Sequence, residues 1–202
     1  MKPMLLASAS PRRRALLAAL GIVFDVWAAD VEEHDDGIAP AVIVEANAQA
    51  KCRAGTAAAK PDALVIGADT LVFFDEKVLS KPDSLEHARD MLRLLSGNTH
   101  QVVTGLAVLD TATGRLVVGS ESTDVTFRPL TDAEIDRFVE IVRPLDRAGA
   151  YTVDGPGSLL VSRYDGCYQN VLGLPIIRLD KMLRTLNYSL FDFICPEKAR
   201  FL

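Results

Sequence analysis

The sequence feature that most constrains the fold is the apolar run "ALVIGADTLVFF" at residues 63–74. Its β-branched and aromatic residues favour a strand over a helix. One charged residue, Asp69, interrupts the run, and burying a carboxylate without a partner is costly. Asp69 is therefore either a strand-end residue that caps a turn or a functional group, such as a metal ligand or a general base.

The stretch "LLASASPRRRALL" at residues 5–17 predicts a strand, a tight turn and a helix. Ser10 suits the N-cap and Pro11 the first helical position, while Gly21 suits the position just after the last turn. Arginines 12–14 add positive charge to a helix end that is already positive. Together with the serine hydroxyls and free N–H groups they predict an anion site suited to phosphate; the alternative is that these arginines are simply solvated.

The rest of the chain continues to alternate between strand and helix patterns. We expect strands at 4–7, 24–28, 63–74, 78–79, 100–110 and 115–127, a strand and turn within 157–166, and helices at 11–20, 40–59, 84–96, 132–142 and 175–186. Because hairpins accompany the helices, the pattern predicts an α/β fold whose sheet is mixed and not strictly parallel. Residues 1–186 form the expected single domain, and 187–202 form a tail with no assigned element.

Composition excludes several classes of protein. The chain has 202 residues, 49% of them hydrophobic, which suits one globular domain, and its net charge of −5 argues against general nucleic-acid binding. No apolar run approaches the roughly 20 residues that span a bilayer, and the start lacks a secretory signal, so we expect no membrane partner. Three widely spaced cysteines, Cys52, Cys167 and Cys195, fit a reducing compartment and predict a cytoplasmic protein.

Four further side chains could join the phosphate site. Pro82 favours an extended conformation at Lys81 and would aim that side chain, although Lys81 could equally be a surface lysine. Lys51 could contact phosphate or extend along a helix surface, and Glu32 and Glu33 could hold a metal or form a solvated loop. This set suits a metal-bound polyphosphate, because cations hold phosphate oxygens while carboxylates hold Mg²⁺ and orient water.

Other common chemistries lack their sequence patterns. The chain has no G-x-x-x-x-G-K-[ST] phosphate loop and no G-x-S-x-G, and its three histidines, His34, His87 and His100, show no metal-binding spacing. Because these patterns are absent, the sequence gives no support to a P-loop nucleotidase, a serine hydrolase with this motif or a histidine metal site.

Six blocks in order carry a family resemblance: "LLASASPRR", "GADT", "SKP", "LSGNTHQVVTG", "LDRAGAY" and "NVLGLP". Over about residues 4–186 the chain resembles the Maf family of nucleoside triphosphate pyrophosphatases. The resemblance implies an α/β fold related to the inosine triphosphate pyrophosphatases, with two lobes flanking a deep cleft. It also implies cleavage between the α and β phosphates, a divalent metal (Mg²⁺ or Mn²⁺), and a homodimer in many members.

The resemblance implies three groups of site residues. Phosphate contacts fall on Ser8, Ser10, Arg13 and Lys51. The proton acceptor falls on Asp69, with Lys81 and Glu33 as further catalytic residues, and the metal ligands are Glu33 and Asp69. Positions associated with base selection fall on Arg12, Thr70 and Asp154.

The implied substrate depends on the last group. One Maf branch prefers dTTP and UTP and usually has S-P-R-R, G-A-D-T and A-G-A-Y-x-x-Q-G; this chain matches it at Arg12 and Thr70 but has Asp154 in place of the glutamine. A second branch prefers 7-methyl-GTP. An ionised aspartate only accepts hydrogen bonds, and one lost bond costs about 1–3 kcal/mol. We expect dTTP or UTP, with 7-methyl-GTP or another guanine nucleotide as the alternative.

Two alternatives of other classes stay open at this stage. A non-catalytic nucleotide-binding regulator of cell division or septum formation could use the same cleft, and a phosphatase would release orthophosphate. Asp69 argues against a pure binder, because a carboxylate beside a triphosphate repels it unless a metal intervenes.

Overall fold

The computed structural model describes residues 2–28, 30–35, 39–75 and 77–200. Within them one mixed sheet contains β1 (Met4–Ala7), β2 (Asp25–Val26), β3 (Leu64–Phe74), β4 (Lys77–Leu79), β5 (Thr99–Asp110), β6 (Leu116–Phe127) and β7 (Val161–Asp165). The strand order is β2-β1-β3-β5-β6-β7, with β4 also paired to β3. Pairs β1–β2 and β1–β3 are parallel and the others antiparallel. The predicted α/β fold with a mixed sheet is confirmed.

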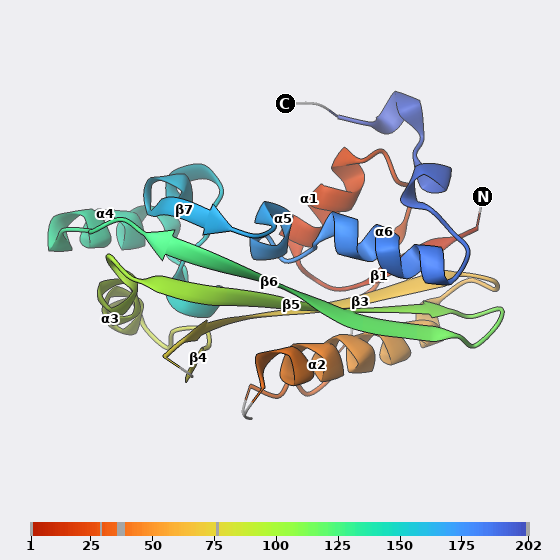
Figure 1. Cartoon of the computed structure of the whole chain (residues 1–202), viewed down its shortest axis with the longest axis horizontal. Helices are drawn as coiled ribbons and strands as arrows, with labels where there is room; N and C mark the ends of the chain where they lie inside the picture. The colour runs from red at the N-terminus through yellow and green to blue at the C-terminus, as the bar shows by residue number, and fades with distance from the viewer. Residues whose placement is uncertain (1, 29, 36–38, 76, 201–202) are drawn as a thin grey trace.

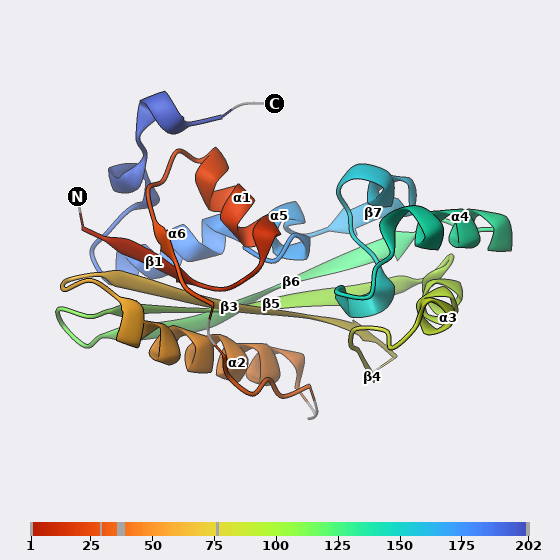
Figure 2. The same cartoon turned by 180° about the vertical axis from the view of Figure 1, so that it is seen from behind.

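The helices cover both faces of this sheet (Figures 1 and 2). They are α1 (Pro11–Ala19), α2 (Pro40–Gly55), α3 (Leu85–Leu95), α4 (Asp132–Val142), α5 (Tyr168–Val171) and α6 (Ile176–Thr185). Helix α2 lies on one face, α1 and α6 lie on the other, and α3 and α4 lie at one end of the β5–β6 hairpin. Among the described residues, no helix is both long enough and apolar enough to cross a bilayer.

Strand β1 shows why the sheet takes a helix on each face. All four of its side chains are buried. Met4 and Leu6 pack with residues of α1 and α6, whereas Leu5 and Ala7 pack against α2. Successive side chains of a strand point to opposite faces, so an uninterrupted apolar strand needs cover on both sides.

Two glycines bring α2 unusually close to the sheet. A Cβ at Gly67 of β3 would overlap the carbonyl oxygen of Ala48, and a Cβ at Gly105 of β5 would overlap that of Val44. Without side chains at these positions the helix backbone rests directly on the strands. Polar side chains on the sheet-facing side of α2 therefore reach β3.

The buried side chains form two large cores, one at each end of the sheet. One core lies beneath α1 and α6 and includes Leu17 and Leu179. The other lies between α3, α4 and the sheet and includes Leu92, Phe127 and Ile135. The two cores make the two lobes that the family resemblance implies.

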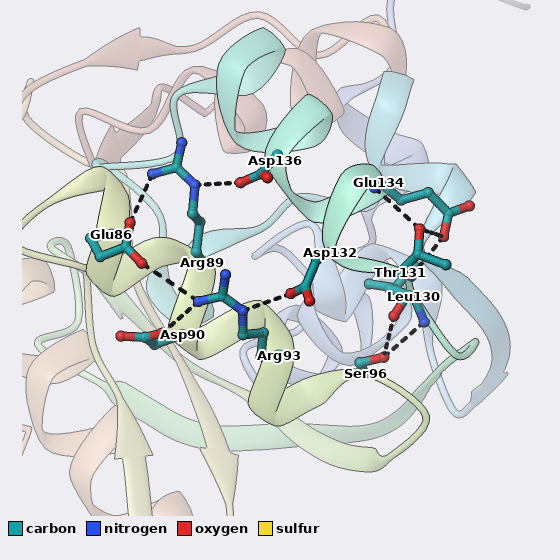
Figure 3. A network of polar contacts seen from close by, with 10 residues as sticks. All are labelled: Glu86, Arg89, Asp90, Arg93, Ser96, Leu130, Thr131, Asp132, Glu134 and Asp136. Carbon is teal, nitrogen blue, oxygen red and sulfur yellow. Dashed lines mark hydrogen bonds and ion pairs between the residues drawn. The ribbon is translucent and has the colours of Figure 1, made fainter.

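Ion pairs link α3 to α4 at the surface of the second lobe (Figure 3). Arg93 Nε lies 2.9 Å from Asp132 Oδ1, and Arg89 Nε lies 2.7 Å from Asp136 Oδ1. Exposed pairs contribute about 0–1 kcal/mol each. The apolar contacts beneath them are therefore the main source of stability between these helices.

The C-terminal tail packs on the first lobe, although the sequence predicts no element there. Two 3₁₀ turns lie at Leu190–Phe193 and Pro196–Lys198. The Cys195 N–H donates to the Gly21 carbonyl at 3.0 Å, and Ile194 forms a bridge with Ile22. The turns thus extend the core beneath α1.

Some predicted boundaries are wrong. The expected strand at 24–28 reduces to β2, whose two side chains are exposed. Residues Gly155–Leu159 form a 3₁₀ turn before β7, because "GPG" favours a turn. Helix α5 is not predicted, and α6 begins one residue late because Pro175 is its N-cap.

Candidate active site

The candidate site lies where one edge of β3 lacks a neighbouring strand. Strand β1 pairs with β3 as far as Ala7↔Gly67, and β4 pairs with it from Val72. Between these pairs, residues 68–71 face no other described strand on that edge. A cavity of about 340 Å³ opens there, and residues of both lobes line it.

Nine of the ten predicted site residues line this cavity: Ser8, Ser10, Arg12, Arg13, Glu33, Lys51, Asp69, Thr70 and Lys81. The lining also includes Arg147 and Asp146, so five cationic side chains face three acidic ones. The cavity therefore carries an excess of positive charge in a chain whose net charge is −5. Such a cavity attracts anions.

Arg13 is fixed by groups from three parts of the chain. Its Nε donates to the Gly173 carbonyl at 2.8 Å, Nη1 to Ser8 Oγ at 3.1 Å, and Nη2 to Thr70 Oγ1 at 2.9 Å. Burial lowers the pKa of Arg13, while the carboxylate of Asp69 acts to raise it. A guanidinium has five N–H donors, so Arg13 both holds the turn before α1 and keeps donors for an anion.

Asp69 is buried and has a cationic partner, which removes much of the cost of burying it. Its Oδ1 lies 2.6 Å from Lys51 Nζ, and the same ammonium lies 3.0 Å from Glu33 Oε1. The strand alternation places Asp69 on the α2 face and Thr70 on the α1 face. Neighbouring residues of β3 thus serve the two sides of the cavity.

Asn47 is a site neighbour that our sequence analysis missed. It is 1% exposed and lies one helical turn before Lys51. Its Nδ2 donates to Asp69 Oδ2 at 2.9 Å. Asn47 and Lys51 are four residues apart, which places them on the same face of the helix. This spacing is the sequence feature that indicates Asn47 as a neighbour of the site.

The carboxylates of Glu33 and Asp69 fit a divalent cation. They already share one cation, the Lys51 ammonium. Mg²⁺ is usually held by one or two carboxylates together with water and substrate phosphates. In the described parts of the chain, no group of three or more His, Cys, Asp or Glu side chains is placed to hold a metal; a cation held by these two carboxylates would take its other ligands from water and substrate phosphates.

The tenth predicted residue, Asp154, lies outside the cavity lining. It is exposed, and its carboxylate accepts a hydrogen bond from Thr152 Oγ1, whereas Thr152 itself lines the cavity. Burial and the nearby Arg147 lower the pKa of Arg12, whereas Asp154 and Asp146 act to raise it. Asp154 therefore lies within electrostatic reach of Arg12 at the cavity's edge.

Tyr151, also missed, forms the wall on the second lobe. Its hydroxyl lies 2.7 Å from His100 Nε2, and both rings pack edge-on against Phe127. Burial lowers the pKa of His100 to about 4, so His100 is neutral at pH 7. Tyr151 is the last residue of the block "AGAY", but no sequence pattern indicates that it contacts His100, which is 51 residues away.

A positively charged cleft between two lobes, with paired carboxylates at a strand edge, defines an α/β protein whose site has the chemistry suited to a polyphosphate and a divalent cation. Comparison with known proteins specifies the family. The model of the Maf-like protein family matches residues 3–186. The chain belongs to this family.

Its similarity to individual relatives extends over nearly the whole chain. It is 45% identical over 191 residues to the dTTP/UTP pyrophosphatase of Desulforamulus reducens, covering 94% of this chain and 100% of that protein. It is 48% identical over 184 residues to the dTTP/UTP pyrophosphatase of Moorella thermoacetica, covering 91% and 94%.

Proposed function

We propose that this protein hydrolyses dTTP and UTP between the α and β phosphates, releasing the nucleoside monophosphate and pyrophosphate. The observation that carries the proposal is the buried carboxylate of Asp69, placed with Lys51 and Glu33 in a cationic cavity. The names of the similar proteins support the same reaction and the same substrates.

Each residue type has a role in this reaction. Phosphate oxygens bind at the start of α1, to the side chains of Arg13, Ser8 and Ser10. The free backbone N–H groups of the first helical turn point toward the same phosphate oxygens. Lys51 and Lys81 neutralise charge that develops on the departing pyrophosphate. Asp69 accepts the proton of the attacking water. A divalent cation, held by Glu33 and Asp69, would supply further charge neutralisation.

We propose that Asp154 does not select the base directly. Its carboxylate is engaged by Thr152 and Asp154 lies outside the lining, whereas Thr152, Arg12 and Thr70 are among the polar residues that line the cavity and could face the base. On this view the Asp154→Gln variant keeps the wild-type order of substrates. A switch of preference in that variant would assign base selection to Asp154.

We also propose that residues 1–186 carry the activity, that the tail 187–202 supports α1, and that the reaction takes place in the cytoplasm. The packing of the tail beneath α1 and the three unpaired cysteines support these assignments.

The test is an assay with dTTP, UTP, CTP, GTP and 7-methyl-GTP in Mg²⁺ or Mn²⁺, with pyrophosphate and orthophosphate measured separately. We expect pyrophosphate from dTTP and UTP, and a loss of about 10²–10⁴-fold in the Asp69→Asn variant. Release mainly from guanine nucleotides would overturn the substrate, and orthophosphate as the first product would overturn the reaction. No turnover at all would favour a nucleotide-binding regulator.

A further inference from the structure

Asn47 joins the acidic loop to the carboxylate at the strand edge. Its Nδ2 donates to the His34 carbonyl at 2.7 Å and to Asp69 Oδ2 at 2.9 Å, while its Oδ1 accepts the His34 N–H at 3.0 Å. Each end of the amide thus faces only complementary groups, which fixes its orientation. One neutral side chain ties together a loop, a helix and a strand.

This contact has consequences for both predicted metal ligands. His34 directly follows Glu33, so fixing the His34 backbone at both N–H and C=O fixes the start of the Glu33 side chain. Glu33 Oε1 then lies 3.0 Å from Lys51 Nζ. The oxygens of Asp69 are divided, because Asn47 binds Oδ2 and Lys51 binds Oδ1.

We propose that Asn47 is a positioning residue that holds Glu33 and Asp69 in their working arrangement; this inference rests on the proposed function. Asn47 is not among the residues that line the cavity, so it acts through the groups it binds. An amide is required because the position needs a donor and an acceptor together. An aspartate would place a second negative charge against Asp69, and an alanine would leave the His34 backbone and Asp69 Oδ2 without this partner.

The kinetic test compares Asn47→Ala and Asn47→Asp with a matched control, Gln49→Ala, two residues along the same helix. We expect kcat for dTTP to fall about 10–100-fold in both Asn47 variants, as is typical when a group supporting a metal ligand is lost. KM for dTTP should change less than about threefold, because no substrate-contacting group is removed. The Gln49 variant should match the wild type.

Two results would overturn the proposal. One is a wild-type kcat in a folded Asn47 variant. The other is a loss of activity that only follows the fraction of folded protein, measured by circular dichroism at the assay temperature. If Asn47→Ala does not fold, kcat is compared in the isosteric Asn47→Asp variant, which can still accept the His34 N–H but cannot donate to the His34 carbonyl or to Asp69.

A second readout needs no activity. Glu-specific protease can cleave after Glu32 or Glu33, which lie exposed in the loop that Asn47 binds. We expect cleavage there, identified by mass spectrometry, to be at least about fivefold faster in Asn47→Ala than in the wild type or Gln49→Ala, because local opening becomes easier. Unchanged cleavage in Asn47→Ala would show that Asn47 does not hold the loop, even if the enzyme is active. Faster cleavage in a protein with no turnover would support the loop contact while refuting the proposed function.

Discussion

Asp69 and His100 are both buried ionisable residues, but burial is made tolerable in different ways: Asp69 is paired with a charged partner, whereas His100 is neutral. Asp69 is placed against the Lys51 ammonium, so charge compensates charge. His100 has an aromatic environment and one hydroxyl partner, and no described group binds its Nδ1. His100 therefore stays neutral, and its protonation opposes folding.

We predict that stability falls between pH 7 and pH 4 because of His100. Its pKa is about 4 in the folded protein, against about 6.5 when unfolded. The unfolded chain therefore binds the extra proton first as pH drops, and the free energy of unfolding should fall by about 2 kcal/mol between pH 7.5 and pH 5. Urea unfolding at the two pH values measures this change.

The control is His100→Gln, which has no titratable group. Its stability should depend less steeply on pH by the same amount, whatever its stability at pH 7.5. Equal pH dependence in the variant and the wild type would contradict this account.

At the scale of elements, the glycine contacts of α2 decide whether its side chains reach the cavity. Gly67→Ala would force a methyl group into the α2 backbone, 2.6 Å from the Cys52 nitrogen. We predict a destabilisation of about 1–3 kcal/mol from overpacking, together with loss of activity as Lys51 moves away from Asp69. Thermal unfolding and the pyrophosphate assay measure the two effects.

Gly114→Ala separates stability from activity. Unlike Gly67, Gly114 has positive φ (70°), and a Cβ there would meet no described atom within 4 Å. It should cost about 1 kcal/mol through backbone strain and leave activity unchanged. Equal activity in Gly67→Ala and the wild type would show that α2 tolerates displacement.

The tail offers a second comparison within one 3₁₀ turn. Phe193 is 3% exposed and Phe191 is 78% exposed. We predict that Phe193→Ala costs about 3–5 kcal/mol, whereas Phe191→Ala stays within about 0.5 kcal/mol of the wild type. Urea midpoints of the two variants test this, and similar midpoints would mean that the tail contributes little to the first core.

At the scale of the whole molecule, the cavity joins two separately packed lobes. A ligand that contacts the start of α1 and the loop around Arg147 touches both lobes. We predict that a non-hydrolysable α,β-imido analogue of dTTP with Mg²⁺, at about 100 times its Kd, adds about 2.7 kcal/mol of stability. For a chain of this size that raises Tm by about 5–10 °C. GTP analogues at the same concentration should raise it less, and no shift with any analogue would argue against a nucleotide site.

Local patterns were enough to predict much of the architecture and the chemistry. Periodicity and capping residues predicted β3, α1 and α4, all of which the structure contains. These features depend on neighbours a few residues apart. The ordered blocks also predicted the family, which the comparisons confirm. Most of the predicted site residues lie in the same blocks, while their catalytic roles stay predictions.

Only the tertiary structure decided which groups meet. The bond from Asn47 to Asp69 depends on α2 resting on Gly67 and Gly105, and the engagement of Asp154 by Thr152 depends on how one loop folds. Arg147 lines the cavity because the second lobe packs opposite the first. Such contacts join residues that are distant in the chain. Local sequence propensities do not determine how closely a helix packs against a sheet, because that distance depends on the packing of side chains from the whole fold.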